Sequence, residues 1–376
     1  MSAYSGYPRH QYTCVDRVPV GYSGGSAADE NGALLYPQEL NWIGQFVAGY
    51  VDGREATCAF CASTGATRGA TYVRYGQYAC SASSVTLYSG VTGGSFYSDA
   101  GGGPDYMCMP PSPTYDSFTD GTQAGGRIFY TEYELTGSGV VRHRGLQDRE
   151  VPCAYCEATG RRTSFMFPAR YTCPNRFTLD YMGFMVAPHN SQRRSEFSCM
   201  DYEAVTGRNT VPSNENGALF YTVQVNDFPL GFAYQQFREL SCARCSTDEG
   251  IVFTRWGRRE CPQGSLPIYA GWAGAAHYTH TGSSHNRLCM PDVPEYSPNA
   301  METTTGDEGG ALIYRMEYQT SGYGLASLAF LHDEDVPCAL CLTEAPSVFT
   351  QWGGGQHCPY GAYVGEGERA CARERE

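Results

Sequence analysis

The sequence predicts an all-β protein of tandem, disulfide-stapled repeats of about 93 residues, each a β-sandwich or a barrel-like sheet pair. Two observations predict the β class: short alternating apolar runs lie between Gly, Pro, Asn and Asp clusters, and no segment keeps a 3.6-residue apolar period. The spacing of the 17 cysteines predicts the repeats. With 376 residues and 41% hydrophobic content, the chain is large enough to form packed cores.

A Cys-Ala-x-Cys phrase marks the repeats because it occurs four times, as CAFC, CAYC, CARC and CALC. Its first cysteine recurs after 95, 89 and 96 residues, and two further cysteines follow each copy of the phrase. We expect these cysteines to form disulfides. They are Cys58, Cys61, Cys80 and Cys108; Cys153, Cys156, Cys173 and Cys199; Cys242, Cys245, Cys261 and Cys289; and Cys338, Cys341, Cys358 and Cys371.

Each repeat begins with a turn and a strand. About 20 residues before the phrase, Asn-Gly or Gly-Gly precedes an apolar run that ends in Tyr, at residues 30–36, 124–130, 215–221 and 308–314. Asn and Gly admit positive φ, and the apolar residues that follow prefer a pleated strand. After the phrase come a second aromatic strand, such as VFTRWG, a third cysteine, a Tyr-x-Gly run and a final Cys-Met.

The boundaries between repeats are expected in the Pro- and acid-rich stretches that follow each final cysteine. They divide the chain into an N-terminal closing-strand fragment at 1–16 and repeats at 17–110, 111–201, 202–292 and 293–376. The fourth repeat is truncated, because 12 residues separate its last two cysteines where the complete repeats have 27, 25 and 27.

The N-terminal fragment resembles the part that the fourth repeat lacks. Its Tyr4-Ser5-Gly6 run and Cys14 match the Tyr-x-Gly run and final cysteine of a complete repeat. This resemblance suggests the hypothesis that residues 1–16 complete the fourth repeat, either within the chain or as a strand donated to the next chain in a head-to-tail polymer. The alternative is two frayed ends, with Cys14 in a local crosslink. The candidate assembly residues are Cys14, Tyr4, Gly6 and Tyr12.

Three chemistries use a Cys-x-x-Cys phrase. A thioredoxin-type centre needs a helix after the phrase, and the residues that follow give no helical signal. A zinc site needs two close pairs of ligands, and each repeat has one. Structural disulfides fit better, because residues i and i+3 of a strand point to opposite faces and reach different partners. We expect two bridges per repeat, from the phrase to the third and fourth cysteines, with the pairing left open.

The cysteine content also indicates the compartment, since disulfide-dense chains belong to oxidising environments. The N-terminal residues lack the apolar core of a signal peptide, so we expect a secreted, extracellular protein from which a leader is missing. A net charge of −13 repels phosphate backbones and anionic membranes, which argues against nucleic acid as a partner. No apolar run approaches the ~18 to 20 residues that span a bilayer, which predicts no membrane insertion.

Two long segments resemble a known family. Residues 253–296 (FTRWGRRECPQGSLPIYAGWAGAAHYTHTGSSHNRLCMPDVPEY) and 148–201 (DREVPCAYCEATGRRTSFMFPARYTCPNRFTLDYMGFMVAPHNSQRRSEFSCMD) are similar to the alternating half-repeats of secreted invertebrate proteins known as short-chain collagen C4-like. The similarity covers almost the whole chain and concerns the cysteine-rich globular part, because the sequence has no Gly-X-Y run. The resemblance implies secretion, disulfides and β structure, and it implies no catalytic residues.

Two groups of residues are candidates for ligand binding. Aromatic residues in matching Arg/Gln-aromatic-Gly contexts are suited to stack sugar rings, and the alternative is that they belong to a β core. The stretch AHYTHTGSSHNR is suited to bind a metal or ligand; against this, His277 and His280 would face opposite ways on a strand, and the alternative is a polar loop. The candidates are Tyr75, Trp256, Trp352, His277, Tyr278 and His280.

The predicted function is that of a secreted structural subunit of an extracellular matrix, fibre or coat, which assembles with copies of itself through β-strand and disulfide contacts. The first alternative is a carbohydrate-binding protein whose partners are glycans, and the second is a secreted enzyme without a recognisable motif. No GxSxG, HExxH or Walker motif is present, and the absence of lysine excludes a lysine nucleophile. We therefore expect no catalytic residues, no metal and no cofactor.

Overall fold

The structure, a computed structural model, describes most of the chain. The described residues are 1–21, 33–41, 49–62, 69–116, 118–123, 125–138, 140–208, 212–226, 233–296, 309–321, 326–345 and 348. Within them the regular elements are strands and two short 3-10 helices, which confirms the predicted all-β class. Three predicted site residues, Trp352, Cys358 and Cys371, lie outside the described residues.

Most strands are short and rich in aromatic and β-branched residues, which suit a pleated backbone. The strands are β1 (Gln38–Leu40), β2 (Arg54–Glu55), β3 (Thr71–Tyr75), β4 (Ser84–Gly94), β5 (Met107–Met109), β6 (Gly126–Tyr133), β7 (Pro152–Ala158), β8 (Thr163–Pro168), β9 (Thr178–Ala187), β10 (Ser198–Asp201), β11 (Ala218–Val225), β12 (Ser241–Thr247), β13 (Ile251–Trp256), β14 (Leu266–Ala275), β15 (Leu288–Pro291), β16 (Ala311–Arg315) and β17 (Pro337–Thr343). The 3-10 helices are η1 (Val141–Leu146) and η2 (Ala326–Leu331).

Twelve strands form three antiparallel sets with the same pairing pattern. The first set is β3, β7, β4 and β5, the second is β8, β12, β9 and β10, and the third is β13, β17, β14 and β15. In each set the strand with the Cys-Ala-x-Cys phrase lies between two strands that precede it in the sequence. The phrase strand is therefore the central strand of its set.

A glycine lets the hairpin strands of each set approach closely. In the first set, a Cβ added to Gly90 on β4 would lie 1.7 Å from the carbonyl oxygen of Met109 on β5. At the same position in the other two sets, a Cβ added to Gly183 or Gly271 would also meet a carbonyl oxygen at 1.7 Å. This close approach explains the glycine of each Tyr-x-Gly run, because glycine has no Cβ.

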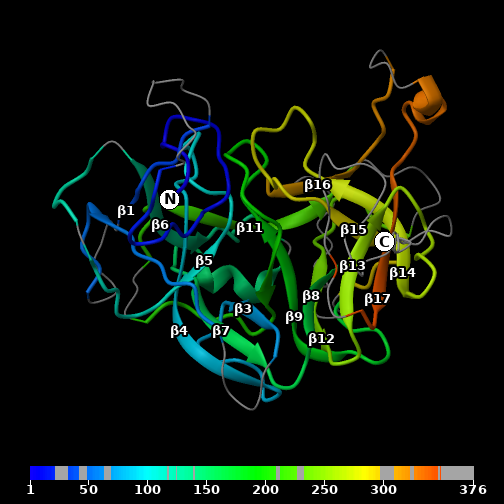
Figure 1. Cartoon of the computed structure of the whole chain (residues 1–376), viewed down its shortest axis with the longest axis horizontal. Coiled ribbons are helices and arrows are strands. Elements are labelled where there is room, and N and C mark those ends of the chain that lie inside the picture. Colours follow the sequence, from blue (N-terminus) through cyan, green and yellow to red (C-terminus); the bar gives the residue numbers. More distant parts are fainter. Residues whose placement is uncertain are drawn as a thin grey trace, which may run out of the picture.

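Four other strands run side by side and in parallel, in the order β1, β6, β11 and β16. We call them the parallel spine, and Figure 1 shows it crossing the molecule from β1 to β16. β6 and β11 each pair through their C-terminal half with the N-terminal half of the next strand, and the short β1 pairs over its whole length with the start of β6. The last partners of each pairing are Leu40 and Ile128, Tyr133 and Phe220, and Val225 and Ile313.

The strand sets share one interior. The largest core cluster contains Tyr72 of the first set, Met185 of the second and Trp272 of the third. The strands also join in one large mixed sheet. The sequence suggested separate sandwich or barrel-like units; the structure instead combines the sets into a single packed body.

Seven disulfides join the described cysteines, and each links two of the segments that the sequence divided. Pairing within a repeat was therefore the wrong expectation. The phrase strand lies between strands that precede it, so its two cysteines meet two different cysteines of the preceding segment. The bridges are Cys14–Cys58, Cys80–Cys156, Cys108–Cys153, Cys173–Cys245, Cys199–Cys242, Cys261–Cys341 and Cys289–Cys338.

Candidate functional site

The first Cys-Ala-x-Cys phrase is uncovered, unlike the other three. Residues 58–61 form no strand and all four are exposed, with Phe60 at 99%. In β7, β12 and β17 the two cysteines and the alanine are buried, because a strand lies on either side. Cys58 is bonded to Cys14, whereas Cys61 is the one cysteine of the described residues without a disulfide. The first phrase has the composition of a central strand, but no strand among the described residues pairs with it.

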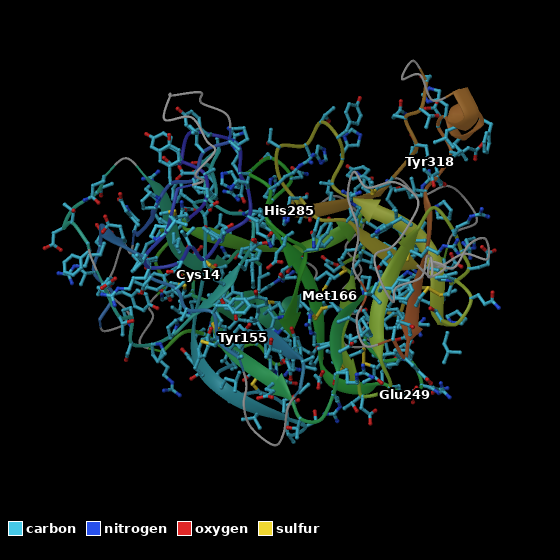
Figure 2. All side chains as sticks on the ribbon, in the orientation of Figure 1. Cys14, Tyr155, Met166, Glu249, His285 and Tyr318 are labelled. Atoms are coloured by element: carbon cyan, nitrogen blue, oxygen red, sulfur yellow. A yellow bond between two sulfur atoms is a disulfide. The ribbon has the colours of Figure 1, made fainter. Side chains whose placement is uncertain are left out.

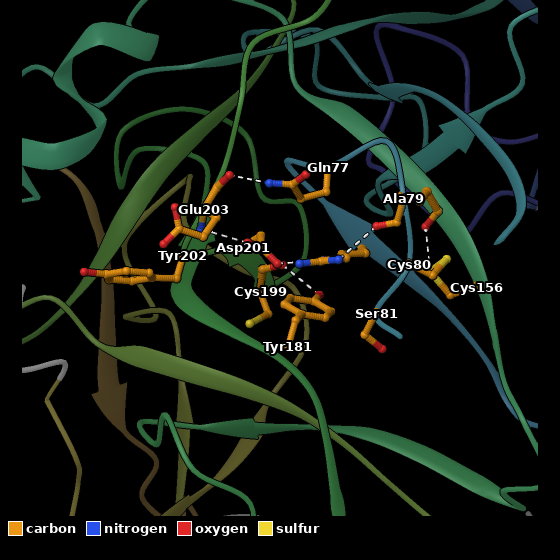
Figure 3. A network of polar contacts seen from close by, with 12 residues as sticks. Gln77, Ala79, Cys80, Ser81, Cys156, Tyr181, Cys199, Asp201, Tyr202 and Glu203 are labelled. Carbon is orange, nitrogen blue, oxygen red and sulfur yellow. Dashed lines mark hydrogen bonds and ion pairs between the residues drawn. A yellow bond between two sulfur atoms is a disulfide. The ribbon is translucent and has the colours of Figure 1, made fainter. Parts of the chain in front are cut away.

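The contact between the first and second strand sets shows how neighbouring sets join. Met200 of β10 pairs with Tyr75 at the end of β3. Arg74 Nε donates to Asp201 Oδ2 over 2.7 Å, and the Asp201 side chain is buried. Figure 3 shows Asp201 at the centre of this network, in which the Gln77 amide also donates to a backbone carbonyl of the second set. An ion pair with a buried carboxylate thus joins the two sets.

Backbone hydrogen bonds complete this contact. Gly76 has a positive φ, and its carbonyl oxygen accepts from Val205 N over 2.9 Å. Tyr133 Oη donates to the Val205 carbonyl oxygen over 3.0 Å. The second and third sets join in the same way, since Glu295 N donates over 2.7 Å to the carbonyl oxygen of Ala169, which also has a positive φ. In both contacts the donor stands six residues after the cysteine of a hairpin strand.

One end of the molecule carries residues that match the donor side of these contacts. Residues 14–20 read CVDRVPV, against CMDYEAV at residues 199–205. Asp16 Oδ1 accepts from the N–H two residues later over 2.8 Å, and Asp201 Oδ1 does the same over 2.7 Å. Val18 and Val20 are 77% and 91% exposed. We define the N-terminal face as residues 14–20, Leu35 and residues 58–61.

The opposite end carries residues that match the acceptor side. Residues 255–257 (Arg-Trp-Gly) end β13 as residues 74–76 (Arg-Tyr-Gly) end β3. Trp256 is 40% exposed, whereas Tyr75 is buried beneath the second set. Figure 2 shows Cys14 and Tyr318 toward opposite ends of the molecule. We define the C-terminal face as residues 255–257, residues 316–319 and Leu328.

The outer edges of the parallel spine belong to these two faces. Leu35, just before β1, is 54% exposed. The equivalent residues within β6, β11 and β16 are buried; they are Ile128, Phe220 and Ile313. Just after β16, Glu317 is exposed, whereas Glu132 and Gln224 in its place are buried. No described strand pairs in parallel with residues 33–35 or 316–318.

The N-terminal segment packs against the first strand set, which differs from the expectation that residues 1–16 complete the fourth repeat. The Arg9 guanidinium donates to the carbonyl oxygens of Phe96 and Asp99, over 2.7 and 3.2 Å. Tyr12 Oη hydrogen-bonds Ser95 Oγ over 2.8 Å. These contacts hold the segment within its own chain.

Tyr4 and Gly6 do not occupy the place of a Tyr-x-Gly run. A Cβ added to Gly6 would meet only the ring of Tyr4, at 3.2 Å, and no carbonyl oxygen as at Gly90. Cys14 does match Cys108, because each is bonded to the first cysteine of a phrase. Within the segment, Cys14 therefore matches its counterpart in a complete repeat, whereas Tyr4 and Gly6 do not.

The structure brings two histidine candidates together. The ring centroids of His277 and His280 lie 5.0 Å apart, and both rings contact Tyr314. These residues follow β14 in a loop, so the strand geometry that would separate them does not apply. Tyr278 is exposed. No three His, Cys, Asp or Glu side chains in the described part of the chain are grouped to hold a metal.

The aromatic candidates have different surroundings. Tyr75 is a core residue, because its Oη donates to the Tyr106 carbonyl oxygen over 3.0 Å and its ring packs edge-on against Phe220. It has no exposed ring face for a sugar. Trp256 belongs to the C-terminal face, and Trp352 lies outside the described residues.

Buried carboxyl groups precede the covered phrases. Glu150, three residues before Cys153, faces Glu132 across a strand pair, and both are buried. Burial raises the pKa of Glu132 to about 8. In the next spine strand Gln224 takes the place of Glu132, and its amide donates to Glu239 over 3.4 Å. At this position of β11, therefore, a neutral amide side chain makes the hydrogen bond without carrying a charge.

The sequence matches no model of a known protein family. The similarity to short-chain collagen C4-like proteins stays a prediction. No helix in the part of the chain that the structure describes is long and apolar enough to cross a bilayer. Sequence reasoning also missed Leu35; the signal was the matching Ala-Leu run.

Proposed function

We propose that this protein is a secreted structural subunit that assembles head to tail into an extracellular polymer. One observation carries the proposal: the parallel spine has two outer edges, at residues 33–35 and 316–318. These residues are equivalent to the residues that pair with each other between the inner spine strands. Because the edges are different surfaces, their contact is heterologous, and such a contact builds an open polymer when the rotation between copies does not close a ring. The disulfides support an oxidising, extracellular setting.

In the polymer, residues 316–318 of one copy pair in parallel with residues 33–35 of the next. The same pairing joins residues 131–133 to residues 218–220 within the chain. There, Glu134 N donates to the Phe220 carbonyl oxygen over 2.9 Å. Gln319 N takes this role toward Leu35 of the next copy, and the contact buries the exposed Leu35 side chain.

The spine contact is tested by placing a charge at the open edge. Leu35→Lys is expected to leave the fold intact, because this side chain is exposed, and to abolish assembly measured by sedimentation velocity and electron microscopy. Leu179→Lys is the matched control, since Leu179 is 41% exposed on β9 in the middle of the chain. A native protein that stays monomeric at high concentration, or a Leu35→Lys variant that assembles normally, would contradict the proposal.

From the sequence spacing we propose a disulfide between Cys61 of one copy and Cys358 of the next as the covalent part of this assembly; Cys358 itself lies outside the described residues. Cys341 is the second cysteine of its phrase, as Cys61 is of the first. Cys341 is bonded to Cys261, and Cys261 stands five residues after the end of β13. Cys358 stands six residues after the matching VFTQW run. The two thiols lose two protons and two electrons as the bond forms, and a small-molecule disulfide accepts them and becomes two thiols.

The disulfide is tested by mixing two variants under a glutathione redox buffer. The native protein is expected to give a ladder on non-reducing electrophoresis, and Cys61→Ser or Cys358→Ser alone only monomer. Mixed together, the two variants have one complementary pair of thiols and should stop at a disulfide-linked dimer. Cys371→Ser is the control and should keep the ladder. A Cys61–Cys358 bond found within one chain by mass spectrometry would refute the interchain link.

A further inference from the structure

The chain leads into the first Cys-Ala-x-Cys phrase as it leads into the covered ones. Two residues before each phrase, a backbone N–H donates to a spine strand. Ala56 N donates to the Gln38 carbonyl oxygen over 2.7 Å, and Val151 N donates to the Thr131 carbonyl oxygen over 2.8 Å. The backbone of the first phrase is therefore anchored to the spine at the same place as that of β7.

After Ala56, the first phrase lacks the hydrogen bonds that the covered phrases make. The Pro152 carbonyl oxygen, just before the second phrase, accepts from Gly76 N, just after β3, over 2.7 Å. Among the described residues, no N–H donates to the matching Thr57 carbonyl oxygen, and the N–H groups of residues 58–61 donate no hydrogen bond. Both edges of the first phrase are therefore open to further strands.

The first phrase already has part of the local geometry of a covered phrase. Cys61 Sγ lies 4.0 Å from the Ala59 carbonyl oxygen, and the matching distances in β7 and β17 are 3.6 and 3.8 Å. Phe60 is exposed, whereas Tyr155, at the same place in β7, stacks on Tyr88 of β4 with ring centroids 5.2 Å apart. Two neighbouring strands would bury the Phe60 ring and satisfy the backbone N–H groups of the phrase.

The C-terminal segment has sequences that match both neighbouring strands of a phrase. The run VFTQWG at 348–353 differs at one position from VFTRWG at 252–257, and the Tyr-x-Gly run at 269–271 recurs as Tyr-Val-Gly at 363–365. Apart from Val348, the C-terminal runs lie outside the described residues. In each strand set such runs flank a phrase that comes later in the sequence, and all four phrases come before residue 348. The C-terminal runs therefore match the neighbours that the first phrase lacks.

The position of β17 indicates that these runs reach the phrase from a second copy. β17 ends at Thr343, and Val348 follows five residues later, so the first run begins within about 18 Å of the end of β17. The first phrase instead follows β2, which pairs with β1. Figure 1 shows β1 and β17 on opposite sides of the molecule, with strands of the second set between them. The phrase is thus far from the C-terminal runs of its own chain and open to those of another copy.

We propose that residues 57–61 of one copy form the central strand between residues 348–352 and 363–365 of a second copy. This inference rests on the proposed function and adds a second contact beside the spine. The occupant is a copy of this chain because both flanking runs are the chain's own. The same arrangement brings together Cys61 and Cys358, the two thiols of the proposed interchain disulfide.

The third strand set supplies the register of this contact. In it the alanine of the phrase, Ala339, lies opposite Arg255 of the first flanking strand. Ala59 then lies opposite Gln351, which stands at the matching place in the C-terminal run. On the other side of the phrase, Tyr363 covers the exposed aromatic ring, as the tyrosine of β4 covers that of β7. The phrase thereby gains both of the neighbours that a covered phrase has.

A proline substitution in a Cys61→Ser background tests this contact without the disulfide. Ala59→Pro removes a backbone N–H from the proposed central strand, and it is expected to weaken assembly by more than about 30-fold in concentration, measured by sedimentation velocity. The fold should stay intact, because Ala59 is exposed and lies in no strand. Ala82→Pro is the matched control, since Ala82 is exposed at a turn position that favours proline, and it should assemble normally.

Mixing and hydrogen exchange identify the partner segment. Gln351→Pro should weaken assembly as Ala59→Pro does. Mixed together, the two variants have one intact pair of segments and should form a one-to-one dimer at the concentration at which the background assembles. In the assembled native protein, the amides of residues 58–61 should exchange more slowly than in the monomer, whereas those of the turn at residues 81–84 should not change.

The outcomes separate this contact from the proposed function. If the native protein assembles and Ala59→Pro assembles as readily as Ala82→Pro, the phrase is not part of the interface, while the polymer stands. If the phrase is protected from exchange in a monomer, it pairs within its own chain; if it stays unprotected in the polymer, it is no central strand. Either result overturns this contact. If the native protein never assembles, the proposed function fails as well.

Discussion

The phrases at residues 58–61 and 153–156 differ only by Phe60 and Tyr155, yet one is exposed coil and the other a buried central strand. The covered phrase hydrogen-bonds β3 on one side and β4 on the other, whereas no strand in the described part of the chain pairs with the first phrase. Local sequence therefore does not decide the conformation of the phrase. The neighbouring strands decide it, because they satisfy the backbone polar groups and bury the side chains.

The two phrases also show that the disulfide forms both with and without the sheet. Cys58 and Cys153 are each bonded to a cysteine from the preceding segment, Cys14 and Cys108. Of the two phrase cysteines Cys58 and Cys153, only Cys153 lies in a strand. A bridge to the first cysteine of a phrase thus accompanies both conformations, and the sheet is what distinguishes them.

The largest expected effect is the loss of the bridge inside the covered phrase. The double variant Cys108→Ala/Cys153→Ala should lower the free energy of unfolding by about 4 kcal/mol in denaturant titration, because the bridge closes a loop of 45 residues in the unfolded chain. Cys14→Ala/Cys58→Ala should cost less than about 1 kcal/mol, since its phrase is outside the sheet and can fray locally. Equal losses would show that the uncovered phrase belongs to the same cooperative unit.

A smaller effect is expected at the glycine that faces the covered phrase. Gly90 lies opposite Cys153, and Gly90→Ala places a Cβ against the Met109 carbonyl oxygen. The two hairpin strands must separate, which should cost about 3 kcal/mol of unfolding free energy. Gly6→Ala is the control, because only a side chain lies near it. A Gly90→Ala protein with native stability would show that β5 moves freely.

The smallest of the three effects concerns the acid pair before the covered phrase. The pKa of Glu132 is raised from 4.5 in the unfolded chain to about 8 in the folded protein. Between these values the folded state binds the extra proton, so the stability from this group is complete below pH 4.5 and is lost as the pH rises through 8. We expect the free energy of unfolding to fall by about 2 kcal/mol from pH 5 to 7.

Glu132→Gln should remove this pH dependence, since a neutral amide makes the same contact as Gln224 does with Glu239. Denaturant titrations at several pH values measure the change, and Glu317→Gln at the exposed spine edge is the control. A Glu132→Gln protein with the native pH profile would place the titrating group elsewhere.

The sequence was sufficient for the β class and for the importance of the cysteine phrase. Alternating apolar runs predict strands because the pattern is local, and the i, i+3 spacing correctly predicted that the two cysteines of a phrase reach different partners. The sequence was insufficient to predict which strands and which cysteines pair. The phrase strand lies between two earlier strands, and this long-range order leaves no mark in a local pattern.

The candidate site was predicted in part. Cys14 was correctly matched to Cys108, but Tyr4 and Gly6 were assigned to a hairpin that they do not form. Leu35 and Glu317 were missed because each is an ordinary residue by itself. Their significance appears only when the pairings within the parallel spine are compared with its two outer edges.

The parallel direction of the spine gives a polymer of this protein a polarity. Every copy would point the same way, so one tip of the polymer would present Leu35 and Cys61 and the other would present Glu317 and Trp256. The two tips differ in charge, in apolar surface and in thiol chemistry, and they would therefore gain and lose subunits at different rates. A variant with one intact face would block growth at a single tip, at concentrations far below that of the native protein.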